Sequence, residues 1–340
     1  MIIMPVALQL ELTQQCNLRC VYCYNDSNMK TKEHLRKDLL RNIILQAKSM
    51  GFFHLVFSGG EPLLYQYYEP AFQYAFESDF NVVLNTNATI LNSRIVSLLQ
   101  HNKVKQVNIN LESHNKLRHD QIRGQECFDL VVANIRKMAD LGLRKKICIG
   151  FVLNNLNQAD LEGYFAFIKN LELDSIRFIH FLPIGRGGRH HNLEVDFATL
   201  PDIIRQLSKL SIEYNIRVLY GHSLDILVKR NDIPASQLAT EIASCEAGKI
   251  GLTIDCHGNV YPCPFLKGPY FYCGNVNERP LIDIWNKSDI LQLLRNNALE
   301  DSECLQCKGY KICYGGCNAW KFYKNGRIDI RDPRCSAIHG

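Results

Sequence analysis

Three cysteines near the beginning of the chain have a spacing that suggests chemistry. Cys16, Cys20 and Cys23 stand in one polar loop, with three and then two residues between them. Thiolates this close together can bind one iron-sulfur cluster, and because a 4Fe-4S cluster has four irons, three cysteines leave one iron open to another ligand. A zinc site that lacks its fourth ligand and a set of buried core thiols are the alternatives, but a loop with Asn17 and Arg19 suits neither.

The chain around this loop alternates short apolar runs with segments of helical period, from residue 6 to about residue 182. This alternation predicts repeated β-α units that build a parallel sheet. We expect six strands, at residues 7–13, 54–58, 81–85, 107–111, 146–153 and 175–181. Helices are expected at residues 33–50, 66–78, 91–101, 128–141 and 159–170. Functional side chains should then follow the strands, at the carboxyl edge of a barrel or open sheet.

Cysteines also crowd the last third of the chain. They are Cys245, Cys263, Cys304, Cys307, Cys313, Cys317 and Cys335. Paired CxxC thiolates occur in zinc sites, so the residues alone permit either zinc or iron. Only residues 280–295 have a clear helical period here, and residues 252–255 and 260–263 flank a turn that predicts a hairpin. We expect a bound metal to stabilise so small a core.

The composition of the chain argues against a nucleic-acid-binding, membrane-spanning or secreted protein. The 340 residues are 46% hydrophobic and 21% charged, and the net charge of +5 is too mild and too dispersed to predict nucleic-acid binding. No apolar run reaches about 18 residues, so no membrane span is expected. The first residues carry no secretion signal, and we expect a cytoplasmic protein in which the 14 cysteines stay reduced.

The first cysteine motif resembles the CxxxCxΦC hallmark of the radical S-adenosylmethionine (SAM) superfamily, with Tyr22 at the aromatic position. The resemblance implies an α/β fold in which residues 1–186 form a partial (β/α)6 TIM barrel. It also implies that the open iron is chelated by SAM, and that an electron from the cluster cleaves SAM to a 5′-deoxyadenosyl radical that abstracts hydrogen from the substrate. No side chain is assigned as a catalytic group.

Four further segments resemble the SAM-binding motifs of that family. The Ser-Gly-Gly-Glu-Pro run after the second strand is similar to GGEP, and Asn-Thr-Asn after the third is similar to TNG, with Ala88 where glycine is usual. Asn110 and Glu112 replace an SxD pattern that binds the ribose, and Arg123 is the candidate for the SAM carboxylate, with a surface arginine as the alternative. The implied SAM-binding residues are Tyr22, Gly59, Gly60, Glu61, Asn85, Asn110, Glu112 and Arg123.

The second cysteine region resembles the SPASM extension of radical SAM peptide maturases, and residues 187–244 bridge it to the barrel. The resemblance assigns two auxiliary 4Fe-4S clusters to residues 245–340. One is implied on Cys304, Cys307, Cys313 and Cys335, and the other on Cys245, Cys263 and Cys317. Cys256 or Cys273 could supply a fourth ligand to the second cluster, or its site could stay open to the substrate. Cys127 and Cys148 are expected to be small buried hydrophobes.

SPASM proteins mostly modify ribosomally made peptides, and the resemblance therefore predicts a peptide maturase. A net oxidation is favoured, such as a carbon-carbon, thioether or other carbon-heteroatom crosslink, because auxiliary clusters can take up the electron left on the substrate. Peptide epimerisation, modification of a small molecule and sulfatase maturation are the alternative activities. Pro264 opposes the last, since it follows Cys263 where that group has an aspartate base. A zinc-stabilised binding protein would leave the first cysteine loop unexplained.

The same resemblance suggests partners. These are a peptide or protein substrate and an electron donor of the flavodoxin or ferredoxin type. Cys16 comes too early for the N-terminal leader-binding domain of many peptide maturases. We therefore expect any leader to be recognised by a separate protein or by the region after residue 187.

Overall fold

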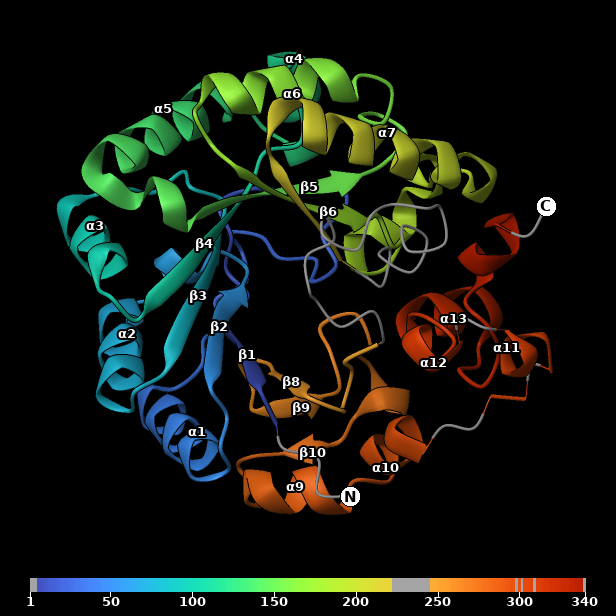
Figure 1. Cartoon of the computed structure of the whole chain (residues 1–340). Coiled ribbons are helices and arrows are strands. Elements are labelled where there is room, and N and C mark those ends of the chain that lie inside the picture. Colours follow the sequence, from blue (N-terminus) through green and yellow to red (C-terminus); the bar gives the residue numbers. More distant parts are fainter. Residues whose placement is uncertain (1–4, 222–244, 297–298, 301, 308–309, 339–340) are drawn as a thin grey trace.

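The computed structural model describes residues 5–221, 245–296, 299–300, 302–307 and 310–338. Strands from both parts of the described chain form one ten-stranded sheet in the order β10-β9-β8-β1-β2-β3-β4-β5-β6-β7. The strands are β1 (Ala7–Thr13), β2 (His54–Gly59), β3 (Asn81–Thr86), β4 (Val104–Asn110), β5 (Ile147–Leu153), β6 (Ser175–His180), β7 (Arg217–Tyr220), β8 (Gly251–Ile254), β9 (Asn259–Tyr261) and β10 (Gly274–Asn275). The sheet curves, and the helices that connect β1 to β7 cover its outer side (Figure 1).

The helices follow the strands as a β-α alternation requires. In the first part of the chain they are α1 (Lys37–Ser49), α2 (Tyr68–Glu77), α3 (Ser93–Gln100), α4 (Lys116–Arg123), α5 (Phe128–Met138), α6 (Leu161–Asn170) and α7 (Leu200–Tyr214). In the cysteine-rich part they are α9 (Leu281–Lys287), α10 (Asp289–Asn296), α11 (Ser302–Gln306), α12 (Tyr310–Cys313) and α13 (Asn318–Asn325). No helix among the described residues is long and apolar enough to cross a membrane.

The alternation of side chains in β1 explains how the sheet is layered. Leu8, Leu10 and Leu12 are fully buried and join the same apolar cluster as Leu40 of α1, so this face of the strand points toward the helices. Gln9 and Glu11 stand on the opposite face, inside the curve of the sheet. Polar side chains of β1 therefore face the interior of the barrel, and we expect the site there because the functional side chains are polar.

The expected fold class is confirmed, as are the six strands of the partial barrel and the hairpin. Two differences have clear physical causes. Helix α4 was not expected because most of its residues are polar, but Asn115 caps it by accepting a hydrogen bond from the Arg118 amide at 3.0 Å. The expected helix at 280–295 is divided into α9 and α10, since Ser288 between them has an extended backbone.

The cysteine-rich part is continuous with the barrel sheet. Strand β8 pairs in parallel with β1, and β7 extends the opposite edge beside β6. The hairpin of β8 and β9 therefore lies directly beside the strand that leads to the first cysteine loop. Residues 222–244 of the expected bridging region lie outside the described residues.

Candidate active site

The first cysteine loop leaves the carboxyl end of β1 and is fixed by backbone hydrogen bonds. The Cys16 amide donates to Asn28 at 3.2 Å, and the Val21 amide donates to Ile122 at the end of α4 at 3.0 Å. The sulfur atoms of Cys16, Cys20 and Cys23 are spread out in the described structure, and at least two of them lie more than 4.8 Å apart. One tetrahedral zinc would need sulfurs about 3.8 Å apart, given a Zn–S bond of about 2.3 Å. A cluster in which each thiolate binds a different iron fits the wider spacing.

Burial keeps the thiols of Cys16 and Cys20 in their neutral form when no metal is bound. Burial raises the pKa of Cys16 to about 12, and burial also raises the pKa of Cys20 although the Arg123 guanidinium opposes the shift. Metal ligation needs thiolates. The positive charge of a bound cluster would supply the stabilisation that the protein alone does not give.

Gly59 and Gly60 let strand β2 approach the cysteine loop. A Cβ atom on Gly59 would lie 2.4 Å from the Thr13 carbonyl oxygen, and one on Gly60 would lie 2.2 Å from that of Gln15. Both distances are far below van der Waals contact. The Gly60 amide donates to Thr13 at 2.7 Å, and the Glu61 amide donates to Gln15 at 2.8 Å. The glycine pair therefore fixes the backbone that precedes the first cysteine.

Glu61 ties this turn to the segment after β3. Its fully buried carboxylate accepts hydrogen bonds from the Leu63 amide at 3.1 Å, the Thr86 hydroxyl at 2.8 Å and the Asn87 amide at 2.7 Å. Burial raises the pKa of Glu61, and these donors oppose the shift. Asn87 in turn lies beside the cysteine loop and donates to Asn17 at 2.8 Å. The carboxylate thus positions one wall of the site.

Tyr22, Glu112 and Arg123 form a buried polar network beside the loop. The Tyr22 hydroxyl donates to Glu112 Oε1 at 2.6 Å, and Arg123 Nη1 donates to the Tyr22 oxygen. Asn110 Nδ2 donates to the same carboxylate oxygen at 3.1 Å, and the Val152 amide donates to the other at 2.8 Å. Burial raises the pKa of Glu112, and Arg123, with Nη1 3.8 Å from it, opposes the shift.

This network contains an atom suited to an additional anionic partner. Arg123 Nε is buried, and it has no hydrogen-bond partner within the described part of the chain. A carboxylate would satisfy it, and an arginine fork suits a carboxylate. The residues present therefore fit the carboxylate of SAM at this position.

The remaining sequence candidates line the barrel interior near the same edge. Asn85 accepts a hydrogen bond from Asn108 at 2.7 Å, between neighbouring strands β3 and β4. Ala88 has a φ of 57°, which is the left-handed region that glycine adopts without strain. The unusual alanine therefore takes the backbone conformation of the glycine that it replaces.

Three residues at the site, Glu11, Tyr24 and Lys267, belong to none of the motifs found in the sequence. Lys267 Nζ lies 2.6 Å from both carboxylate oxygens of Glu11, and the Tyr24 hydroxyl donates to Glu11 Oε1 at 3.3 Å. Glu11 is fully buried in β1, Tyr24 directly follows Cys23, and Lys267 comes from the loop after β9. The sequence signal for this group was an acidic residue on the polar face of the alternating strand β1.

Three cysteines of the SPASM part lie near one another. The thiols of Cys245 and Cys317 are hydrogen-bonded to each other. Burial and the nearby Cys245 together raise the pKa of Cys263 to about 12. The Cys317 amide donates to Asp332 at 2.8 Å, so the end of the chain supports this group.

Six further cysteines belong to the SPASM part of the chain. Cys304 and Cys307 belong to α11 and the residue after it, Cys313 ends α12, and Cys335 lies in the 3-10 helix Pro333–Ile338. Cys256 is buried where Asp255, Glu11 and Glu33 raise its pKa beyond the effect of burial. Cys273 donates to the Phe271 carbonyl oxygen at 3.5 Å.

The fold and the site are those of an α/β enzyme, and two family models match the chain. The family model described as the radical SAM superfamily matches residues 10–168, and the SPASM model, an iron-sulfur cluster-binding domain, matches residues 245–308. The chain belongs to the radical SAM superfamily and carries a SPASM domain. SAM and iron-sulfur clusters are accordingly its cofactors.

Individual relatives cover almost the whole chain. Mycofactocin maturase MftC of Mycolicibacterium smegmatis is 28% identical over 333 residues, which cover 97% of this chain and 82% of the relative. AdoMet-dependent heme synthase of Methanosarcina barkeri is 26% identical over 97% of this chain and 96% of the relative. The structure of Streptococcus suis SuiB bound to precursor peptide SuiA superimposes with a TM-score of 0.81 at 19% identity, covering 100% of this chain and 77% of that chain. This last likeness supports the fold.

Proposed function

We propose that the protein is a peptide maturase that uses a 5′-deoxyadenosyl radical to introduce an oxidative crosslink into a ribosomally made peptide. The observation that carries the proposal is the meeting of the cysteine loop, the Arg123 network and a polar barrel interior at one edge of the sheet. The similarity to mycofactocin maturase over 97% of the chain supports a peptide as the substrate class.

We assign the first cluster to Cys16, Cys20 and Cys23. When bound, the reduced cluster and SAM supply the radical that removes a hydrogen atom from the substrate. Gly59 and Gly60 fix the backbone of the loop, and Glu61 holds the Asn87 wall against it.

The chain's own groups are placed to bind and orient SAM. The buried Nε of Arg123 has no hydrogen-bond partner among the described residues and would be satisfied by a carboxylate, and Glu112 holds Arg123 and Tyr22 in position. Glu112 is itself fully buried, so we assign it the positioning of these two side chains. Asn85 and Asn110 offer amide groups at the same edge of the barrel.

We assign two auxiliary clusters to the SPASM domain, with the two ligand sets that the resemblance to SPASM proteins implies. The group of Cys245, Cys263 and Cys317 supports one of them. A crosslink removes two hydrogen atoms from the peptide: one leaves with the radical, and the other leaves as a proton and an electron for which an auxiliary cluster is the acceptor. A flavodoxin or ferredoxin would reduce the first cluster.

Mass spectrometry of a coexpressed peptide tests this function. Short peptides encoded beside the gene are produced anaerobically with the protein, and with a control in which Cys16, Cys20 and Cys23 are all alanine. Loss of two hydrogens from one peptide, only with the intact motif, is the expected result. An unchanged mass for every such peptide, without solvent deuterium uptake that would report epimerisation, contradicts peptide maturation.

A small-molecule substrate is the second candidate. It is favoured by the 26% identity to AdoMet-dependent heme synthase over 97% of the chain. Incubation of the reduced protein with SAM and iron coproporphyrin separates the two candidates. Substrate-dependent formation of 5′-deoxyadenosine with the porphyrin, and none with the peptides, would favour the second.

A further inference from the structure

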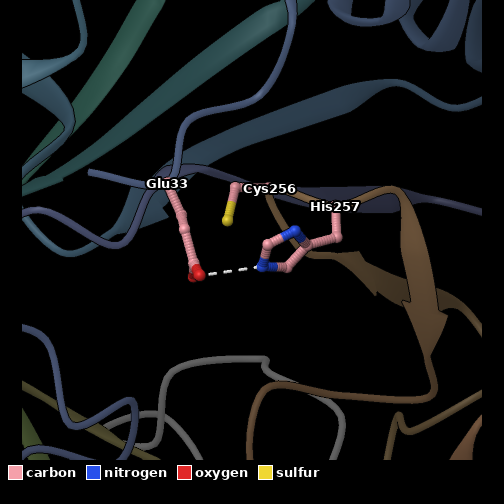
Figure 2. A group of neighbouring side chains, drawn as sticks. All are labelled: Glu33, Cys256 and His257. Carbon is pink, nitrogen blue, oxygen red and sulfur yellow. Dashed lines mark hydrogen bonds and ion pairs between the residues drawn. The ribbon is translucent and has the colours of Figure 1, made fainter. Parts of the chain in front are cut away.

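Glu33, Cys256 and His257 bring three different metal-binding groups together outside the cysteine clusters (Figure 2). His257 Nε2 lies 3.1 Å from Glu33 Oε2, and the Cys256 sulfur lies within 4.8 Å of the ligand atoms of both. Glu33 comes from the loop before α1, whereas the other two residues form the turn between β8 and β9. Figure 2 shows the sulfur pointing between the carboxylate and the imidazole.

Both backbones that carry these groups are held in place. The Glu33 carbonyl oxygen accepts hydrogen bonds from the Gln14 amide at 3.0 Å and from the Thr13 hydroxyl at 3.1 Å. The His257 amide donates to Asp255 Oδ1 at 2.9 Å. The positions of the three side chains are therefore supported by contacts that do not depend on the Glu33–His257 pair.

Burial and exposure within the group suit a metal ion. Cys256 is only 4% exposed, whereas the Glu33 and His257 side chains are 50% and 48% exposed. An ion can reach the group from solvent, and water can complete its coordination. An exposed glutamate-histidine pair by itself contributes little to stability, and it would not require a thiol beneath it.

The types of ligand atom in this group favour zinc over magnesium or calcium. Zinc is bound by thiolate, imidazole and carboxylate, and it takes four ligands in a tetrahedron. Magnesium and calcium prefer oxygen ligands only. Binding would form one bond to each of the three side chains and release the thiol proton to solvent.

We propose that Glu33, Cys256 and His257 bind one zinc ion that joins the hairpin of the SPASM part to the loop of the barrel. Because the Glu33 carbonyl is bonded to Thr13 and Gln14, the ion would fasten the hairpin to the chain immediately before Cys16. The proposal also gives Cys256 a role separate from the auxiliary clusters. It does not depend on the identity of the substrate.

Metal analysis of the full cluster-loaded protein tests the site. The anaerobically purified chain is incubated with zinc sulfate and desalted, and its zinc and iron are counted. Its zinc is then examined by X-ray absorption. We expect about one zinc per chain, with one sulfur at about 2.3 Å and nitrogen or oxygen ligands at about 2.0–2.2 Å. Cys256→Ser and His257→Gln should each weaken zinc binding at least about tenfold and leave the iron content unchanged.

Matched variants separate this site from general effects. Cys148→Ser changes another buried thiol, and His114→Gln changes another histidine paired with a carboxylate, Asp160 at 3.1 Å. Both should retain the zinc. Since the His257 side chain is half exposed, its variant remains informative if Cys256→Ser loses its fold. The proposal would be overturned if the unchanged protein retained no zinc, if its zinc were bound by several sulfurs, or if the Cys256 and His257 variants retained as much zinc as the unchanged protein. Each of these outcomes is independent of the activity of the enzyme.

Discussion

Lys267 and Glu11 form a bidentate ion pair that joins the SPASM part to the first strand of the barrel, with Nζ 2.6 Å from both carboxylate oxygens. Glu11 is fully buried and the Lys267 side chain is 22% exposed. Asn25 accepts from Lys267 at 2.9 Å, and Tyr24 donates to Glu11. The pair therefore anchors the end of the first cysteine loop to the loop that follows Cys263.

Replacing Lys267 with methionine should destabilise the protein by about 3–5 kcal/mol, because Glu11 then remains as a buried carboxylate without its cation. The double variant Glu11→Gln with Lys267→Met should recover most of this loss. Denaturant unfolding under anaerobic conditions measures both. If the double variant were as unstable as Lys267→Met, charge burial would not be the cause.

Glu61→Gln should weaken SAM binding and lower stability. The amide has one acceptor oxygen in place of two, so at least one of its three hydrogen-bond donors is left buried without a partner, at a cost of about 1–3 kcal/mol. Isothermal titration with SAM and thermal unfolding report the two effects. Glu69→Gln is the control, since that carboxylate is 38% exposed and pairs with Arg94 at 3.6 Å. Equal effects of both changes would contradict a positioning role for Glu61.

Gly60→Ala should displace the cysteine loop, because the new Cβ would meet the Gln15 carbonyl oxygen at 2.2 Å. We expect loss of the SAM-dependent change in the electron paramagnetic resonance spectrum of the first cluster, and a lower iron content. Gly188→Ala is the matched control, since its nearest contact would be an ordinary 3.4 Å. A normal spectrum in Gly60→Ala would show that the loop tolerates a side chain at this position.

His119 should make stability dependent on pH. Burial and the nearby Arg123 charge together lower its pKa to about 3, whereas the unfolded value is about 6.5. The unfolded chain alone therefore gains a proton as the pH falls below about 6.5. The contribution of His119 to the free energy of unfolding should be fully present above that pH. Below it, this contribution should decrease by about 1.4 kcal/mol per pH unit.

The variant His119→Gln isolates this contribution. Between pH 7 and pH 5 its free energy of unfolding should decrease by about 2 kcal/mol less than that of the unchanged protein. Denaturant titration at the two pH values measures the difference, whatever the stability of the variant at pH 7. Identical decreases would mean that His119 has the same pKa in the folded and the unfolded protein, and would contradict the prediction.

The sequence predicted the barrel strands well because they are local and strongly patterned. Residues 147–153 are an apolar run buried along its whole length, and the structure places β5 there. Helix α4 was missed because its residues are mostly polar and lack a clear apolar period, and only three of them, His119, Ile122 and Arg123, are buried. The Asn115 cap and Gly124, with a φ of 79°, flank the helix directly and are the local signals that could have indicated it.

Some residues of the candidate site could likewise be predicted from local sequence patterns, and others could not. The cysteine motif and the glycine turn have local signatures, and the structure places them beside each other. Lys267 is 256 residues from Glu11 and could not be linked to it by spacing. The pairing of β8 with β1 is what brings the two parts together, and no local pattern predicts a contact between strands so distant in the chain.

Isotope transfer tests whether the 5′-deoxyadenosyl radical removes hydrogen from a peptide. The reduced protein is incubated with SAM and a fully deuterated peptide substrate, and the 5′-deoxyadenosine is analysed by mass spectrometry. We expect one deuterium in the 5′-deoxyadenosine and a matching loss from the peptide, both absent when Cys16, Cys20 and Cys23 are alanine. Formation of 5′-deoxyadenosine without deuterium, while the peptide stays unchanged, would contradict this expectation.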